Sequence, residues 1–412
     1  MYTYSRRSLL KMTALGAGTA VVGAPLAGCG KSTASPTKTV RYWSYTTEAD
    51  RAAEDKWFAL FPKAVPGGRV QKIFVPSDQM TGKVIGSAAS RTGPDAFESS
   101  GDLDQLVPAG VVTDLTTYWD SWSDRSKFPA GAVGRRNGKV YSVKPYSNLI
   151  GLWYNADILD KLSITPPVTF DELGAALAKV KQAGYVGLAI AGDANLDAEW
   201  QARPFYSGFG FDYLHPDVAP LQQTFELFTG WLRAGYLPAD VATWNQVTSF
   251  PRFTAGNVVF CVNGNWQRGK AKTDAKFRYG VAPMPRGPMG GTVYLGGEEF
   301  CVGRFASDPK LAWEYLTSTV LSHDGGLVAL DFGSVPNRTD LSAAPEMQDP
   351  VVKSFQAAIR SGTEYPDPGL GTKVSAVRQV FGQSWNGLLA GQKSPQRAAQ
   401  DVVAGLQRLL HP

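Results

Sequence analysis

The sequence predicts an α/β fold in which parallel sheets are covered by helices and the chain forms two domains. Segments with the period of strands alternate with segments of helical period, which indicates βαβ units. A second α/β unit follows the first along the chain. The length of 412 residues exceeds the roughly 250–300 residues at which single cores stop growing, so two domains, or one domain with large insertions, are expected.

The first half of the chain begins this alternation at residue 39. A strand is expected at 39–45, a helix at 48–61, a strand at 69–74 and a helix at 78–90. The Gly-Pro-Asp turn at 93–95 then introduces a short strand and a loop. Asn137-Gly138 predicts a tight hairpin turn, because this dipeptide readily takes positive φ values.

The second half continues the same pattern. A Thr-Phe-Asp-Glu capping box at 169–172 predicts the start of a helix that runs to residue 181. The other elements expected are strands at 149–154, 187–190, 257–263 and 293–302, an extended segment at 279–283, a Pro/Gly-rich loop at 283–291, and helices at 221–233, 309–321 and 395–410.

The first 28 residues predict an export signal. Arg6 and Arg7 resemble a twin-arginine signal for the export of folded proteins, and the charge-free stretch 12–26 is too short to span a membrane. The Leu-Ala-Gly-Cys pattern that ends at Cys29 resembles a bacterial lipobox, so Cys29 is the expected lipidation site. Residues 29–38 are then a lipid-anchored tether, and the protein is expected on the extracytoplasmic face of the cell membrane.

Charge and cysteine content exclude several classes of function. Removing residues 1–28 removes three basic residues and no acid, which lowers the formal charge from +5 to +2 and argues against a nucleic-acid partner. No motif for a cofactor is present, and the three His residues lack metal-ligand spacing. Cys261 and Cys301 lie in apolar strand segments and are interpreted as inert core thiols, although a disulfide stays possible outside the cell.

The order of short motifs over 39–410 resembles the extracellular solute-binding proteins of carbohydrate ABC importers, the family 1 group that includes maltose-binding protein. The motifs are Trp43 at the end of the first strand, Gly93-Pro94-Asp95, Gly138-Lys139-Val140-Tyr141, Leu152-Trp153-Tyr154-Asn155, the segments 166–173 and 253–257, Asn263-Gly264-Asn265-Trp266, Pro283-Met284-Pro285, Gly296-Gly297, and Gly333-Ser334-Val335-Pro336-Asn337.

This resemblance implies a type II periplasmic-binding-protein fold with two lobes and a ligand cleft between them. Each lobe is a mostly parallel sheet flanked by helices, and the chain crosses between lobes near 145–148, 296–300 and 336–341. The lobes implied are 39–146 plus 299–338 for the N-terminal lobe, and 147–298 plus 339–412 for the C-terminal lobe. Hinge closure around the ligand follows from this topology. The resemblance also implies ABC permease subunits as partners, a monomer, and no cofactor.

A sugar presents C–H groups on one face and hydroxyls at its edge, so its receptor needs a flat aromatic side chain beside planar polar groups. Trp266, just after a strand and next to Asn265, is the first candidate for the stacking surface, and Trp200 is the second. Tyr45 is favoured over Trp43 because it lies nearer the strand end. Ordinary core packing is the alternative for each of these aromatic residues.

Polar candidates lie in loops at the expected ends of strands and at the crossings. Glu98 and Asp102 follow the Gly-Pro-Asp strand, where open α/β folds bind ligands, although solvated loop carboxylates are the alternative. Glu298 is favoured over Glu299 at the second crossing. The remaining candidates are Asn148 at the first crossing and Asn337 and Arg338 at the third.

These residues predict capture of a sugar or oligosaccharide, without catalysis, and delivery to an ABC permease. Arg338 also suits phosphate or carboxylate, so the same fold binding a glycerophosphodiester, an amino sugar or another charged polar solute is the alternative. A cell-surface carbohydrate-processing enzyme is the alternative from another class. It would need two carboxylates at a fixed separation, and the candidate carboxylates lie in several loops.

Overall fold

The computed structural model describes residues 38–46, 51–361, 363–364 and 370–410. The twin arginines, the lipobox with Cys29, and the tether up to residue 37 lie outside the described residues, as do His411 and residues 48–50 of the first expected helix.

The first sheet has six strands in the order β2-β1-β3-β12-β5-β4. The strands are β1 (Thr39–Ser44), β2 (Arg69–Phe74), β3 (Ala96–Ser99), β4 (Val133–Arg136), β5 (Lys139–Val143) and β12 (Glu299–Val302). β1 runs parallel to both β2 and β3, as the βαβ pattern predicts, whereas β12 runs antiparallel to β3 and β5. The β4–β5 hairpin is confirmed, and Asn137 and Gly138 turn with φ of 50° and 78°.

Helices and apolar cores cover both faces of this sheet. The helices are α1 (Arg51–Ala64), α2 (Ser77–Ser87), α3 (Leu103–Leu106), α4 (Thr116–Ser121), α11 (Pro309–Ser318) and α12 (His323–Ala329). Successive side chains of β12 point to opposite faces of the sheet and so enter different cores. Phe300 packs with Trp57 of α1 in one core, and Cys301 packs with Met80 of α2 in the other.

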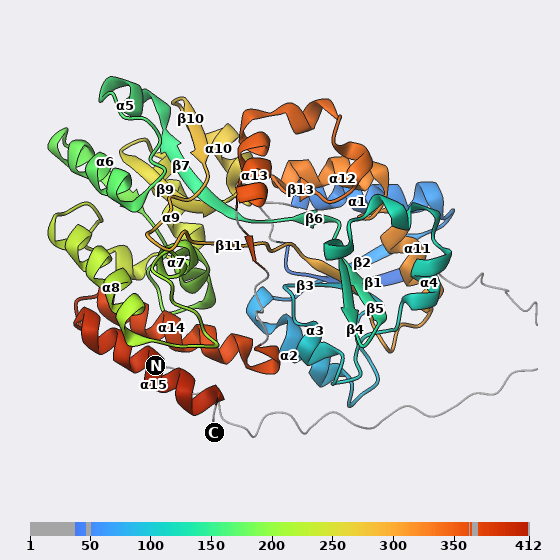
Figure 1. Ribbon diagram of the computed structural model, residues 1–412. Helices are drawn as coiled ribbons and strands as arrows, with labels where there is room; N and C mark the ends of the chain where they lie inside the picture. The colour runs from blue at the N-terminus through green and yellow to red at the C-terminus, as the bar shows by residue number, and fades with distance from the viewer. Residues whose placement is uncertain (1–37, 47–50, 362, 365–369, 411–412) are drawn as a thin grey trace, which may run out of the picture. The chain divides into compact units, whose positions relative to one another are not determined.

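The second sheet has four strands in the order β10-β7-β9-β8. Of these, β7, β9 and β10 are labelled in Figure 1. Its strands are β7 (Ile150–Asn155), β8 (Val186–Ala189), β9 (Val258–Gly264) and β10 (Tyr279–Ala282). β8 is parallel to β9, while β7 is antiparallel to β9 and β10. Both sheets are therefore mixed, and the expectation of mostly parallel pairing holds only for β1 to β3 and for β8 with β9.

The second sheet carries most of the helices. They are α5 (Ala156–Lys161), α6 (Phe170–Gln182), α7 (Leu196–Gly208), α8 (Val218–Arg233), α9 (Gln246–Thr254), α10 (Arg268–Asp274), α13 (Pro350–Ser361), α14 (Val374–Leu389) and α15 (Pro395–Leu410). The Thr169 hydroxyl caps α6 as the capping box predicts, by accepting from the Glu172 amide. Figure 1 shows α14 and α15 beside α8, and all three contribute to the core of this sheet.

Short elements complete the chain. The two-residue strands are β6 (Tyr146–Ser147) with β13 (Val335–Pro336), and β11 (Val293–Tyr294) with β14 (Thr363–Glu364). The 3₁₀ helices are η2 (Ser123–Lys127), η3 (Ala130–Ala132), η4 (Val241–Thr243), η5 (Asn265–Gln267), η6 (Leu330–Phe332), η7 (Thr339–Leu341), η8 (Pro345–Gln348) and η9 (Gly371–Lys373).

One expectation from the sequence is corrected, and one segment to which no element was assigned is a helix. The strand expected at 293–302 is broken: β11 ends at Tyr294 and β12 begins at Glu299. Gly297 in the gap has φ of +119°, and a Cβ there would lie 2.2 Å from the carbonyl oxygen of Tyr146, so the chain turns where only glycine fits. The polar segment around Trp200 is a helix, α7, capped by the Asn195 side chain.

The cysteines have the role that their apolar sequence context predicts. Cys261 lies in β9 and Cys301 in β12, and both are buried and free. Burial raises the pKa of both thiols. Among the described residues, no helix is both long and apolar enough to span a bilayer. The described part of the chain also holds no group of three or more His, Cys, Asp or Glu side chains suited to a metal ion.

Candidate functional site

Asn148 is the centre of a hydrogen-bonded cluster where the chain passes between the two sheets. Its Nδ2 donates to Oε2 of Glu298 at 3.1 Å. Its Oδ1 accepts from Asn265 Nδ2 at 3.0 Å and from Ser334 Oγ at 2.8 Å. Four segments that are distant in sequence therefore converge on one side-chain amide.

The backbone reinforces this junction. Asn148 and Gly296 exchange both amide hydrogen bonds, at 2.7 Å and 3.3 Å. β6 pairs antiparallel with β13 beside them, with Ser147 opposite Val335. The three segments expected to cross between lobes thus lie next to one another, as a hinge requires.

The Glu98 side chain is buried at the first sheet and does not lie in a solvated loop. It is 1 % exposed, and its Oε1 lies 2.7 Å from Ser44 Oγ and accepts from the Tyr45 amide at 2.5 Å. Burial, and next the charge of Glu298, raise the pKa of Glu98 to about 8, against the opposing hydrogen bond from Ser44.

A further proton is needed in this cluster. The Ser44 hydroxyl lies 2.7 Å from Glu54 as well as from Glu98, but it has one hydrogen to donate. One of the two carboxyl groups must therefore donate to Ser44. Glu54 also pairs with Lys72, so Glu98, with its raised pKa, is the better proton carrier.

Glu298 and Tyr45 meet at the same place. Burial raises the pKa of Glu298, and the hydrogen bond from the Tyr146 hydroxyl only partly offsets it. The Tyr45 hydroxyl is buried beside the Glu298 carboxyl group, and its hydrogen bond also acts to lower the pKa of Glu298. Burial and then the charges of Glu298 and Glu98 raise the pKa of Tyr45. Tyr45 and Glu298 therefore form a buried polar pair at the junction.

Trp200 approaches this cluster from the second sheet. Its side chain is partly buried on α7, and its Nε1 is buried with no hydrogen-bond partner among the described residues. A Cβ added at Gly296 would lie 2.9 Å from the Trp200 ring and 3.3 Å from the Asn148 carbonyl oxygen. The indole therefore lies directly against the second crossing.

Trp266 lies in η5, immediately after β9, as the sequence predicts. The ring folds back over Gly264, where an added Cβ would come within 2.1 Å of it. It is partly buried against the core of the second sheet. Asn265 beside it is fully buried, and protein groups satisfy its side-chain amide: its Oδ1 accepts from the Leu149 amide, and its Nδ2 donates to Asn148 and to the Gly333 carbonyl.

Three predicted ligand residues already form hydrogen bonds with other protein groups. Arg338 is 4 % exposed, and its guanidinium bonds Asp124, Asp340 and the Leu321 carbonyl, so it is not placed as a counter-charge for a ligand. Asn337 accepts from the Ser147 hydroxyl and donates to the Lys144 carbonyl, which fixes β13 to β6. Asp102, at the start of α3, accepts from the hydroxyl of Thr81.

A buried ion pair next to Trp200 was not found from the sequence. Glu199 is fully buried and pairs with Arg378 of α14. The hydroxyls of Tyr206, Tyr213 and Tyr294 all contact the same carboxylate oxygen. The position of Glu199 next to a candidate aromatic residue was a signal, but its partner lies 179 positions away in the chain.

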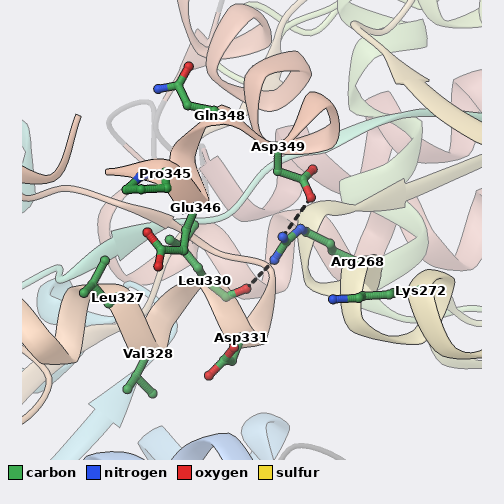
Figure 2. Close-up of a pocket in the computed structure, with 10 residues that line it drawn as sticks. All are labelled: Arg268, Lys272, Leu327, Val328, Leu330, Asp331, Pro345, Glu346, Gln348 and Asp349. Atoms are coloured by element: carbon green, nitrogen blue, oxygen red, sulfur yellow. Dashed lines mark hydrogen bonds and ion pairs between the residues drawn. The ribbon is translucent and has the colours of Figure 1, made fainter. Parts of the chain in front are cut away.

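One cavity lies away from the predicted ligand residues. Figure 2 shows this cavity of about 670 Å³, where α10 faces α12, η6 and η8. Arg268 crosses it to bond Asp349 at 2.8 Å and the Leu330 carbonyl at 2.9 Å. None of the ten predicted ligand residues is among those that line it.

Solved structures with the same fold identify the architecture. The GacH receptor of Streptomyces glaucescens superposes with a TM-score of 0.78 at 23 % identity, covering 90 % of this chain and 98 % of that chain. Maltose-bound MalE3 of T. maritima gives a TM-score of 0.80 at 21 % identity, covering 90 % and 99 %. The two-lobe binding-protein fold is therefore confirmed.

Sequence relatives agree with the fold. The melibiose/raffinose/stachyose-binding protein MelE of Bacillus subtilis is 24 % identical over 298 residues, which are 68 % of each chain. A binding protein of Brucella abortus is 26 % identical over 243 residues, and the match covers 55 % of this chain and 57 % of that relative's length. The family model of bacterial extracellular solute-binding proteins matches residues 56–353. The chain belongs to the bacterial extracellular solute-binding protein family.

Proposed function

We propose that this protein is a lipid-anchored extracellular receptor that binds a sugar or oligosaccharide between its two lobes and delivers it to an ABC permease. The observation that carries the proposal is the cluster of Asn148, Glu298 and Tyr45 at the junction, with the Trp200 indole against it. Planar amide and carboxyl groups bond sugar hydroxyls, and an indole face packs on sugar C–H groups.

The names of related proteins support a carbohydrate ligand. MelE is a melibiose/raffinose/stachyose-binding protein, GacH is described in complex with acarbose, and MalE3 is described with maltose bound. Each is less than 25 % identical to this chain, so the sugar bound here is not carried over from any of them.

The charges at the junction favour a neutral solute over a glycerophosphodiester. The phosphate alternative depended on Arg338, whose guanidinium is already paired with Asp124 and Asp340. The Glu298 carboxyl group in the cluster would repel an anion when ionised, whereas Glu98, with its pKa raised to about 8, holds a proton at neutral pH and carries no charge. Glu298 would attract an ammonium group, so an amino sugar is the second candidate ligand.

We propose binding without hydrolysis. A glycosidase needs one carboxyl group to donate a proton to the substrate and a second to act across the scissile bond. Glu98 instead directs Oε1 at the Ser44 hydroxyl and at two backbone amides, those of Tyr45 and Thr46. These partners support a structural and electrostatic role for Glu98 beside the ligand.

A thermal-shift screen of the mature protein tests the proposal. Neutral oligosaccharides, amino sugars and glycerophosphodiesters would be compared, because a ligand at one hundred times its Kd adds about 2.7 kcal/mol to the stability of the folded state. We expect stabilisation by the first class, or by the second. No shift with either class, or conversion of the sugar to products, would contradict the proposal.

Membrane attachment is tested separately at Cys29. We expect the full-length protein in the membrane fraction of its host, and Cys29→Ser in the soluble extracytoplasmic fraction or unprocessed. Equal distribution of both forms would remove the lipid anchor from the proposal and leave the binding function in place.

A further inference from the structure

We propose that Arg378 is a positioning residue for the ligand-stacking surface: it is held by Glu199, lies against the Trp200 indole, and fixes the orientation in which this ring meets a bound sugar. The inference rests on the proposed function, because it assumes that Trp200 packs on the solute.

Arg378 attaches α14 to the first turns of α7. Its Nε donates to Oε2 of Glu199, and its Nη2 donates to the Leu196 carbonyl at 3.0 Å. Positions 196, 199 and 200 are neighbours on one face of a helix. Two hydrogen bonds from one planar group restrain its rotation, so the guanidinium plane has a fixed orientation relative to α7.

The guanidinium lies over the indole. Its central carbon is 5.2 Å from the centre of the Trp200 ring and 5.5 Å from that of Tyr294. The two aromatic rings are 4.9 Å apart and tilted by 54°. A cation over a tryptophan face is attracted by the π electrons, and the attraction is stronger where water is excluded.

The acid that holds Arg378 is itself held in place. Glu199 is fully buried, and its Oε1 contacts the hydroxyls of Tyr213 at 2.8 Å and Tyr294 at 3.0 Å as well as that of Tyr206. A fully buried, hydrogen-bonded carboxylate cannot follow Arg378 into solvent. The pair is thus a fixed support rather than a mobile surface ion pair.

Trp200 is therefore confined on several sides. Arg378 covers the ring, Tyr294 packs against it, and Gly296 of the second crossing leaves no room at its edge. The side chain is still partly exposed. A ring that is already oriented before the solute arrives loses little side-chain entropy when a sugar packs on it, and this lowers the cost of binding.

A double-mutant cycle on the mature protein tests the inference by titration calorimetry with the sugar selected in the thermal-shift screen. Removing Arg378 alone would leave a buried carboxylate, so the pair is replaced together as Arg378→Met with Glu199→Gln. We expect this paired change to weaken binding about tenfold when Trp200 is present, and less than about twofold in a Trp200→Ala background. Equal losses in both backgrounds, or no loss with Trp200 present, would overturn the inference.

Two further variants separate positioning from general destabilisation. Arg378→Lys keeps the charge but loses the planar fork, so we expect it to preserve the melting temperature better than the affinity. Arg41→Met, which breaks the pair with Asp95 in the first sheet, is the control and should lower stability without changing affinity. If Arg378→Lys retains full affinity, the fixed guanidinium plane has no role.

The outcomes also separate this inference from the proposed function. If the wild-type protein binds no sugar, the proposed function fails and the inference fails with it. If the wild-type protein binds and the cycle is additive, only the role of Arg378 is rejected.

Discussion

Asn148 and Glu298 join two of the three chain crossings, because the side-chain Nδ2 of Asn148 donates to the Glu298 carboxylate at 3.1 Å. Two residues before Glu298, the backbone amide of Gly296 donates to the backbone carbonyl of Asn148. Both side chains are therefore held by the backbone register of the hinge. We expect a solute that bonds either side chain to contact the segments that would bend on lobe closure, and so to link occupancy to closure.

Replacing either candidate tryptophan should weaken or abolish binding without unfolding the protein. We expect Trp266→Ala to abolish the ligand-induced thermal shift and Trp200→Ala to weaken binding by about 1–3 kcal/mol, since both rings are only partly buried and their loss creates small cavities. Titration calorimetry measures the affinity, and circular dichroism checks the fold. Trp266→Phe, which keeps an aromatic face, should retain part of the affinity. Unchanged affinity in Trp266→Ala would remove this residue from the site.

Gly296→Ala should weaken ligand binding about tenfold or more, because the new Cβ would displace the Trp200 ring 2.9 Å away or the Asn148 carbonyl 3.3 Å away. Gly82→Ala in α2 is the matched control. An added Cβ there meets nothing within 4 Å, so it should leave affinity unchanged and raise stability slightly. Equal affinities for the two variants would show that close packing at the second crossing does not position the ring.

Glu98→Gln should stabilise the ligand-free protein increasingly as the pH rises from about 5 to 8. The folded-state pKa of Glu98, about 8, lies above its usual value of 4.5. The folded protein therefore keeps a proton that the unfolded chain releases, and the stability contributed by this proton is lost as the pH rises through that interval.

Glutamine does not titrate, so its advantage over Glu98 should grow to roughly 2–5 kcal/mol by pH 8 and then level off. Urea unfolding at pH 5, 6.5 and 8 measures the difference in the free energy of unfolding. A difference that stays constant with pH, or that shrinks as the pH rises, would contradict the raised pKa.

Arg338→Met should lower the free energy of unfolding by about 2–3 kcal/mol, because it leaves Asp124, Asp340 and the Leu321 carbonyl without their common donor. We expect no change in the relative affinity for neutral and anionic solutes. Denaturant unfolding gives the first quantity and competition binding the second. A selective loss of affinity for an anionic solute would return Arg338 to the ligand site.

The two core cysteines should react only when the protein unfolds. Cys261 and Cys301 are buried and free, and burial raises the pKa of both thiols, so the reactive thiolate is disfavoured at neutral pH. Mass spectrometry after alkylation should show neither residue modified in buffer and both modified in denaturant. A melting temperature that falls on addition of a reductant would instead indicate a disulfide.

Much of the fold follows from local periodicity. Strand 69–74 has the bounds that the sequence predicts, and β1 ends one residue before the expected position. Tertiary contacts decide the rest. The apolar run 293–302 reads as one strand, but packing against Tyr146 forces a turn at Gly297 that alternation along the chain does not reveal.

Asn148 and Glu298 were chosen from the sequence because they lie at expected chain crossings, and the structure brings their side chains together. The site was not predictable where a partner is remote. The sequence around Arg338 does not indicate that it pairs with Asp124, which lies 214 positions earlier. The sequence around Glu199 likewise does not indicate that it pairs with Arg378. Which polar side chains stay free for a ligand depends on these long-range pairs. Apart from Arg338, all the candidate residues stay predictions as ligand contacts.

The strand order of the first sheet has a consequence for biosynthesis. β12 lies between β3 and β5, yet it leaves the ribosome after every strand of the second sheet. Until then β3 and β5 have no strand to join them, and their unpaired edges are open to wrong partners. The sheet of the N-terminal lobe, although most of its strands are synthesised first, can therefore be completed only after about three quarters of the chain has been made.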